Sequence, residues 1–272
     1  MRAFHLLEEI TMMLNELFDL KGKTAIVTGG ARGIGKFLAK GLAEAGANLV
    51  IASRKLETCE AFAAELADAG TASLAVQCDM AKTEQIENLI TESEDHFGQI
   101  DILINNAGVT WGAPTLEYPL DKWEKVFTVN TRGVWVISQA VANKMKTSGG
   151  GRIINVSSVL ASRGTDELTH PAVAYNSSKA AVEVLTKNLA VKLAPYHINV
   201  NCIAPGFFHT DMMAYIFDPK LEKQKENVLM QIPCGRIGTE DDIKALGVFL
   251  ASEASRYING AIIAVDGGMG AK

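Results

Sequence analysis

The stretch TAIVTGGARGIG, residues 24–35, joins a short apolar run to a helical pattern through a glycine-rich loop. Gly29, Gly33 and Gly35 allow the backbone to turn tightly and to approach a ligand closely. The free N–H groups at the start of the next helix favour binding of a pyrophosphate. A strand, a glycine loop and a helix in this order predict the first unit of a dinucleotide-binding fold. The alternative is that the glycines serve only the turn and helix packing.

The same alternation of apolar runs and helical patterns continues to the end of the chain. Strands are expected at 24–29, 47–53, 73–79, 100–108, 151–158, 198–206 and 261–268. Helices are expected at 33–46, 55–69, 82–96, 121–145, 174–190 and 240–252. Strands that are apolar on both faces and separated by helices form parallel sheets that are covered on both sides. The pattern therefore predicts an α/β fold, a single-domain Rossmann-like doubly wound parallel sheet of about seven strands.

Composition excludes several classes of function. The 272 residues carry a net charge of −5 and no basic cluster, which argues against nucleic-acid binding. No apolar run is long enough for a membrane span. The four cysteines have no metal-ligand spacing, so we expect no metal site, reduced thiols and a cytoplasmic location. They are Cys59, Cys78, Cys202 and Cys234.

Three segments stand outside the alternation. Residues 1–20 are expected to form an N-terminal helical extension, because apolar residues recur there at helical spacing, and residues 21–272 a single domain. The segments 159–173 and 207–238 follow the ends of predicted strands, where open α/β sheets bind ligands, and are expected to shape the substrate pocket. The methionines and aromatic residues of 212–217 are interpreted as a substrate lid, with a plain packing helix as the alternative.

Six motifs, in order, resemble the short-chain dehydrogenase/reductase family from about Leu20 to Gly268. They are TGGARGIG (28–35), NNAG (105–108), Asn130 in VNTRG, Ser158, the YxxxK pair Tyr175 and Lys179, and PG at Pro205 and Gly206. This resemblance implies a nicotinamide-dependent oxidoreductase. The signature blocks look closest to 3-oxoacyl-thioester (acyl carrier protein) reductases, and they also resemble polyol, gluconate-type and steroid reductases.

The end of the second predicted strand indicates which dinucleotide is bound. An acid at this place accepts from the 2′-hydroxyl of NAD, whereas a basic residue accommodates the 2′-phosphate of NADP. Ser53 and Arg54 stand here, and Arg32 in the glycine loop adds a second cation. NADP(H) is therefore predicted, with NAD(H) as the alternative if Arg54 only forms a solvated turn.

The resemblance implies further cofactor contacts. Asp79 and Met80 are expected near the adenine, Asn106 to Gly108 near the ribose, and Thr210 near the nicotinamide carboxamide or phosphates. The complete expected cofactor set is Gly29, Arg32, Gly33, Ile34, Gly35, Ser53, Arg54, Asp79, Met80, Asn106, Ala107, Gly108, Tyr175, Lys179, Pro205, Gly206 and Thr210.

The catalytic prediction rests on Tyr175 and Lys179, which lie one turn apart on one helix face. A neighbouring ammonium stabilises a phenolate and lowers the pKa of the phenol, so Tyr175 is expected to act as the acid/base. By resemblance, Lys179 also bonds the nicotinamide ribose, Ser158 holds the substrate oxygen, and Asn130 bends its helix and binds a water. Ser157 alternates to the other face of its strand.

These expectations predict NADPH-dependent, reversible reduction of a ketone to a secondary alcohol, with a 3-oxoacyl thioester as the first candidate substrate. One alternative is an NAD-dependent dehydrogenase of a sugar acid, steroid or other secondary alcohol. Another is a non-catalytic dinucleotide-binding sensor or scaffold. The only partners expected are a small carbonyl or alcohol substrate and further copies of the chain. The resemblance implies an oligomer that pairs long helices and C-terminal strands, and residues 121–145, 175–193 and 257–268 carry the apolar content such faces need, so a homotetramer, or a homodimer, is expected.

Overall fold

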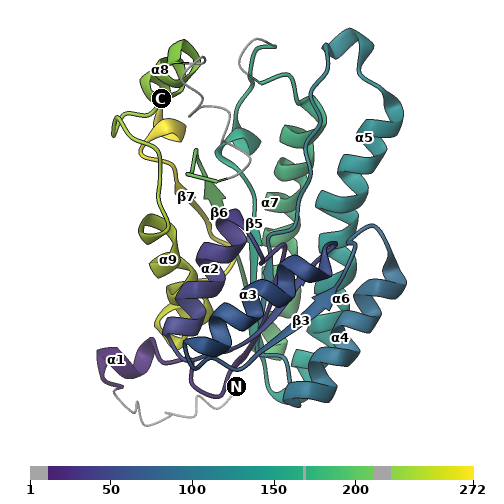
Figure 1. Ribbon diagram of the computed structural model, residues 1–272, viewed down its shortest axis with the longest axis vertical. Helices are drawn as coiled ribbons and strands as arrows, with labels where there is room; N and C mark the ends of the chain where they lie inside the picture. The colour runs from purple at the N-terminus through teal and green to yellow at the C-terminus, as the bar shows by residue number, and fades with distance from the viewer. Residues whose placement is uncertain (1–11, 168–169, 211–221) are drawn as a thin grey trace, which may run out of the picture.

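A computed structural model describes residues 12–167, 170–210 and 222–272 (Figure 1). Its seven strands form one parallel sheet, as the alternating pattern predicts. Their order in the sheet is β3-β2-β1-β4-β5-β6-β7. The strands are β1 (Thr24–Thr28), β2 (Asn48–Ser53), β3 (Ser73–Gln77), β4 (Ile102–Asn105), β5 (Gly151–Val156), β6 (Ile198–Pro205) and β7 (Ile262–Val265). The order reverses between β1 and β4, which is the place where doubly wound sheets bind ligands.

The helices cover both faces of this sheet (Figure 1). The helices of the described residues are α1 (Leu14–Leu17), α2 (Gly33–Glu44), α3 (Leu56–Asp68), α4 (Thr83–Phe97), α5 (Leu120–Phe127), α6 (Val134–Ser148), α7 (Val173–Leu193), α8 (Glu222–Gln231) and α9 (Asp241–Ala251). Helices α2, α3 and α9 pack on one face through Leu38, Phe62 and Ile243. Helices α4, α6 and α7 pack on the other through Ile86, Ile137 and Leu189. Strand residues alternate between the two cores, which explains the continuous apolar runs.

The predicted helix 121–145 is observed as α5 and α6, with an irregular stretch at Asn130, where the resemblance led us to expect a local bend. Between α5 and α6 the chain forms a π-helical stretch, Thr128–Gly133, which includes Asn130. The Asn130 side chain is fully buried and bonds both polar groups of the Val109 main chain. Its Oδ1 accepts from the Val109 N–H at 2.8 Å, and its Nδ2 donates to the Val109 carbonyl oxygen at 2.9 Å. π-helical stretches inside α-helices often occur at functional sites.

Two sequence predictions fall partly or wholly outside the described residues. Of the N-terminal extension, the structure describes the short helix α1 and the buried Leu20, while residues 1–11 lie outside it. The lid residues 212–217 lie outside it as well. Within 207–238, residues 222–231 form α8. Among the described helices, none combines the length and apolar character needed to cross a membrane.

Candidate active site

The glycine loop is held in place by the end of β4. The Asn106 amide donates to the carbonyl oxygens of Thr28 and Gly29, both at 3.0 Å. The Thr28 hydroxyl donates to the Ile104 carbonyl at 3.2 Å and accepts from the N–H groups of Asn106 (3.1 Å) and Ala107 (3.2 Å). These bonds join the carboxyl ends of β1 and β4 at the switch point. The roles of Thr28 and the Asn106 side chain were missed from the sequence, although both lie inside the quoted motifs.

The loop has no room for larger side chains. Gly29 has a φ of +63°, which favours glycine, and a Cβ there would lie 2.9 Å from the Asn106 amide nitrogen. A Cβ on Gly35 would collide with the same nitrogen and with the Gly29 carbonyl. Gly33, with a φ of +53°, lies beneath Thr210, to which a Cβ would come within 3.3 Å. The loop that follows β6 therefore closes over the glycine loop.

The start of α2 fits a pyrophosphate. Arg32 is the N-cap residue, and no side chain caps the first turn, so its N–H groups are available to a ligand. Ile34 is half-buried in that turn against the core. Together with the close approach at Gly29 and Gly35, these residues form a cradle suited to the diphosphate of a dinucleotide.

Two cations lie at the loops that follow β1 and β2, beside this cradle. Arg54 and Arg32 are both exposed, and no ion pair involves either guanidinium in the described part of the chain. The Ser53 hydroxyl donates to the Lys55 carbonyl at 3.2 Å and lies 3.0 Å from the Cys59 sulfur. An exposed, unpaired guanidinium here suits a phosphate.

The residues after β3, β4 and β6 lie at the same carboxyl edge. Asp79 accepts from the Ala81 N–H at 3.0 Å through Oδ1, which leaves Oδ2 available to a ligand, while Met80 is buried in the core. Pro205 ends β6, and Gly206 packs against Asp266, whose Cα would lie 2.8 Å from an added Cβ. The structure therefore brings the predicted cofactor residues together at one edge of the sheet.

The catalytic candidates lie at the ends of β5 and α7. Lys179 is buried, with 4% of its surface exposed, and its ammonium donates to the Val156 carbonyl at 2.7 Å. This ammonium lies 5.8 Å from the centroid of the Tyr175 ring. The Ser158 hydroxyl accepts from the Leu160 N–H at 3.2 Å and is close enough to the Tyr175 phenol to lower its pKa by hydrogen bonding. Ser158, Tyr175 and Lys179 thus converge.

Burial dominates the electrostatics of this group. It raises the pKa of Tyr175, which the hydrogen bond with Ser158 opposes. It also lowers the pKa of Lys179 to about 8, against a smaller opposing effect of the Cys202 thiol. The expectation that Lys179 lowers the pKa of Tyr175 is not met by the protein side chains alone, because the ammonium bonds Val156 rather than the phenol.

Ser157 lies behind this site. Its hydroxyl contacts the Lys179 carbonyl at 3.1 Å and the Glu183 carboxylate at 3.0 Å. Asn130 lies on the other side: besides holding Val109, its amide donates to the Ser178 hydroxyl at 3.0 Å. A Cβ on Gly108 would lie 3.4 Å from both the Asn130 Oδ1 and the Lys179 Nζ, so only a small residue fits between them.

Sequence reasoning missed one wall of the site, residues 109–117. The Ala113 N–H donates to the Pro171 carbonyl at 2.9 Å, and the Thr115 N–H donates to a Glu167 carboxylate oxygen at 2.8 Å. The wall therefore joins the predicted substrate segment 159–173. The one signal in the sequence was a tryptophan, Trp111, three residues after NNAG, and its side chain is exposed in the structure.

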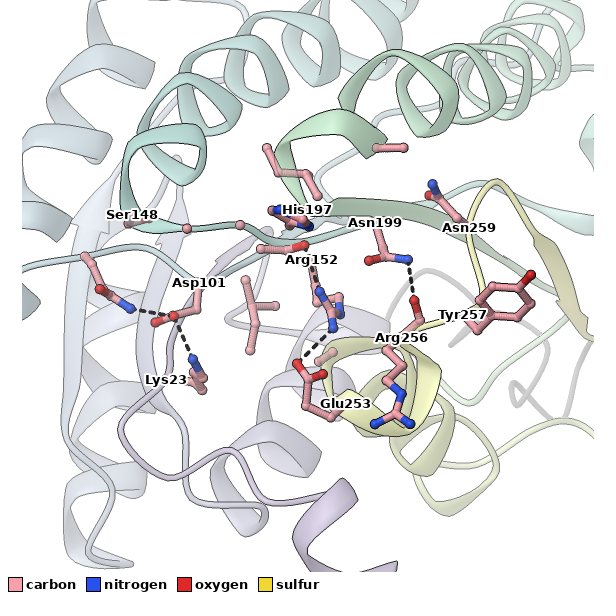
Figure 2. Close-up of a pocket in the computed structure, with 18 residues that line it drawn as sticks. Lys23, Asp101, Ser148, Arg152, His197, Asn199, Glu253, Arg256, Tyr257 and Asn259 are labelled. Carbon is pink, nitrogen blue, oxygen red and sulfur yellow. Dashed lines mark hydrogen bonds and ion pairs between the residues drawn. The ribbon is translucent and has the colours of Figure 1, made fainter. Parts of the chain in front are cut away.

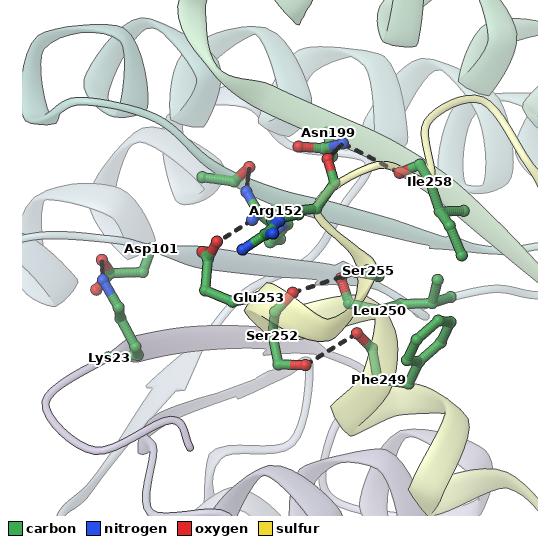
Figure 3. Close-up of polar contacts among 12 residues, drawn as sticks. Lys23, Asp101, Arg152, Asn199, Phe249, Leu250, Ser252, Glu253, Ser255 and Ile258 are labelled. Atoms are coloured by element: carbon green, nitrogen blue, oxygen red, sulfur yellow. Dashed lines mark hydrogen bonds and ion pairs between the residues drawn. The ribbon is translucent and has the colours of Figure 1, made fainter. Parts of the chain in front are cut away.

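A separate cavity of about 590 Å³ lies at the opposite, amino edge of the sheet (Figure 2). Its charged groups largely neutralise one another: Lys23 pairs with Asp101 at 3.2 Å, and Arg152 pairs with Glu253 at 2.9 Å (Figure 3). It contains none of the candidate catalytic residues, so it is not part of this site.

Comparison with known proteins agrees with this geometry. Residues 29–270 match the family described as Enoyl-(Acyl carrier protein) reductase. The chain is 36% identical over 256 residues to 5-keto-D-gluconate 5-reductase of Escherichia coli K12, with 94% of this chain and 98% of the relative covered. It is 38% identical over 251 residues to a 3-oxoacyl-[acyl-carrier-protein] reductase of Aquifex aeolicus, with 92% and 98% covered.

A solved structure is similar over nearly the whole fold. Gluconate 5-dehydrogenase from Burkholderia cenocepacia, in complex with NADP and tartrate, superposes with a TM-score of 0.88 at 37% identity. The match covers 96% of this chain and 100% of that one.

Proposed function

The chain belongs to the short-chain dehydrogenase/reductase family, and we propose that it reduces a ketone to a secondary alcohol, reversibly, with NADPH. The observation that carries this proposal is the convergence of Ser158, Tyr175 and Lys179 beside the glycine-loop cradle. When bound, the nicotinamide supplies the hydride. The protein must then supply a proton and hold the carbonyl oxygen that accepts it.

Each of the three side chains has a distinct role in this proposal. The Ser158 hydroxyl donates to the substrate oxygen and holds it beside the Tyr175 phenol. Tyr175 transfers its hydroxyl proton to that oxygen as the C–H bond forms, which yields a neutral alcohol and leaves a phenolate. The Lys179 ammonium, which bonds the Val156 carbonyl while the phenol is neutral, lies 5.8 Å from the centre of the Tyr175 ring and attracts the phenolate once it forms. Asn130 keeps the π-helical stretch and Val109 in position.

The cofactor proposal rests on two unpaired cations. Arg32 and Arg54 are exposed at the two loops that follow β1 and β2, and no described carboxylate pairs with either. Both suit the 2′-phosphate that distinguishes NADP from NAD. The related gluconate 5-dehydrogenase was solved with NADP, which supports this choice.

We further propose a homotetramer that works in the cytoplasm. Val184 and Val191 on α7 are exposed at 60% and 77%, although the helix otherwise packs well, and Trp135 on α6 is exposed as well. Such apolar residues favour a helical interface between copies. The four cysteines are unpaired, which suits a reducing compartment.

The test is an NADPH-oxidation assay over 5-keto-D-gluconate, acetoacetyl-CoA, diketones and steroids, with wild type and Tyr175→Phe. Wild type should reduce at least one ketone, and Tyr175→Phe should lose about 100-fold or more of the rate while still binding NADPH. Faster turnover with NAD and an alcohol would favour the oxidative alternative. NADPH binding without any turnover, unchanged by the Tyr175 variant, would favour a sensor or scaffold.

A further inference from the structure

Among the described residues, four buried side-chain N or O atoms have no hydrogen-bond partner, and two of these flank Tyr175 along the chain. They are Nε2 of His170, in the predicted substrate segment, and Oδ1 of Asn176, the residue after Tyr175. Leaving a buried polar group unpaired costs free energy, so such atoms in a folded protein call for an explanation, often a functional one. Neither atom is needed for the proton transfer described above.

The main chain of His170 is hydrogen-bonded to neighbouring residues. The His170 N–H donates to the Asp166 carbonyl at 3.0 Å, and the His170 carbonyl accepts from the Ala172 N–H at 2.9 Å. The same carbonyl accepts from the Thr165 hydroxyl at 3.1 Å. Both the N–H and the carbonyl of His170 therefore have partners, and the unpaired atom of this residue is on its side chain.

The Thr165 hydroxyl also determines the orientation of the Asn176 side-chain amide. Thr165 has one hydroxyl proton, which it donates to His170, so it accepts the bond from the Asn176 Nδ2, 3.1 Å away. This assigns the amide nitrogen to Thr165 and leaves Oδ1 as an acceptor. The two unpaired atoms thus belong to one hydrogen-bonded group that joins the substrate segment to the first turn of α7.

The imidazole of His170 lies directly against the proposed acid. Its ring packs edge-to-face on the Tyr175 ring, with centroids 5.9 Å apart and planes at 70°. Burial lowers the pKa of His170, so the ring is neutral near pH 7. A neutral imidazole nitrogen either donates to or accepts from a hydroxyl, depending on its tautomer.

We infer that His170 is a specificity-determining residue whose Nε2 binds a hydroxyl group of the substrate next to the reacting carbonyl, with Asn176 Oδ1 as the second polar contact on this side. The inference rests on the proposed function and narrows the substrate class to a hydroxylated ketone. An unsubstituted acyl chain would leave both polar atoms unpaired. A site built to bond a hydroxyl rejects analogues that lack it far more strongly than an apolar pocket distinguishes sizes.

The test compares two ketones with the same carbon skeleton, 5-keto-D-gluconate and 5-oxohexanoate, which lacks the hydroxyls, with acetoacetyl-CoA as a third substrate. Wild type should favour the hydroxylated ketone by about 100-fold in kcat/KM. His170→Phe keeps an aromatic ring against Tyr175 and should lower kcat/KM for 5-keto-D-gluconate by about 10- to 100-fold, with 5-oxohexanoate nearly unchanged. His170→Gln, which restores a polar nitrogen, should recover part of the preference.

The matched control is His96→Phe, which replaces an exposed histidine at the end of α4 and should change neither substrate. An equal loss for both ketones in His170→Phe, or no loss, would overturn the inference and leave the proposed function intact. A wild-type preference for 5-oxohexanoate or acetoacetyl-CoA would also overturn the inference and leave the proposed function intact. If wild type reduces no ketone at all with NADPH, the proposed function fails, and the inference fails with it.

Discussion

The ammonium of Lys179 donates to the carbonyl oxygen of Val156, 2.7 Å away, and so ties α7 to the last residue of β5. Ser158, two residues beyond Val156, lies close enough to the Tyr175 phenol to lower its pKa by hydrogen bonding. The lysine therefore fixes the distance between the strand that carries the serine and the helix that carries the tyrosine. It does so with a charge that is almost fully buried.

This buried charge should make stability depend on pH. Burial lowers the pKa of Lys179 to about 8 from an ordinary 10.5. Between these pH values the unfolded chain binds the proton and the folded chain does not, so this residue makes the folded state more stable as pH rises. We expect wild type to gain roughly 3 kcal/mol in free energy of unfolding relative to Lys179→Met between pH 7 and pH 10.5.

Urea unfolding of both proteins across this pH range measures the difference, in which the titration of other groups cancels. A difference that stays constant with pH would show that Lys179 keeps its ordinary pKa in the folded protein.

Arg54 should determine which cofactor is used. Arg54→Asp replaces an unpaired cation with the acid that suits the 2′-hydroxyl of NAD, so it should lower kcat/KM for NADPH by about 100-fold and raise it for NADH. Steady-state kinetics with both cofactors measures this change. Arg256→Asp, an exposed arginine beside the opposite cavity, is the control and should leave both values unchanged. Equal use of NADPH and NADH by wild type would refute the NADP assignment.

Gly35→Ala should weaken binding of the cofactor. The added methyl group collides with the Asn106 amide and the Gly29 carbonyl, which together hold the glycine loop. We expect the dissociation constant for NADPH, measured by fluorescence titration, to rise by at least about 10-fold. Gly164→Ala is the matched control, because a Cβ there meets nothing within 4 Å. Unchanged NADPH binding in Gly35→Ala would argue against the cradle.

The fold followed from the sequence because each of its signals is local. Apolar strands, helical spacing and glycine at the first turn are set by residues close together in the chain, and the structure has the predicted seven strands. The interruption of the helix 121–145 at Asn130 was expected only from the family resemblance, since it coincides with a contact between Asn130 and Val109, 21 residues away. Sequence spacing does not record such contacts.

In the candidate site, too, the residues set by local patterns were predicted and those set by contacts between distant segments were missed. Helical geometry paired Tyr175 with Lys179. Strand alternation allowed only one of Ser157 and Ser158 to face the site, and the family resemblance favoured Ser158. The wall at 109–117 was missed because its bonds to Pro171 and Glu167 cross more than 50 residues. The edge-to-face packing of His170 on Tyr175 likewise depends on the path of the loop between them, which no periodicity describes.

The exposed valines of α7 give the last prediction. Val184 and Val191 lie seven positions apart, so they share one face of the helix, and both are exposed in the single chain. If this face pairs with a second copy, Val184→Glu buries a carboxylate in an apolar interface, which is costly without a partner. Light scattering should give the mass of four chains for wild type and a smaller species for Val184→Glu. Leu116→Glu, at a fully exposed loop position outside the predicted interface, should leave the wild-type mass unchanged. A monomer mass for wild type would refute the tetramer, and an unchanged mass in Val184→Glu would place the interface elsewhere.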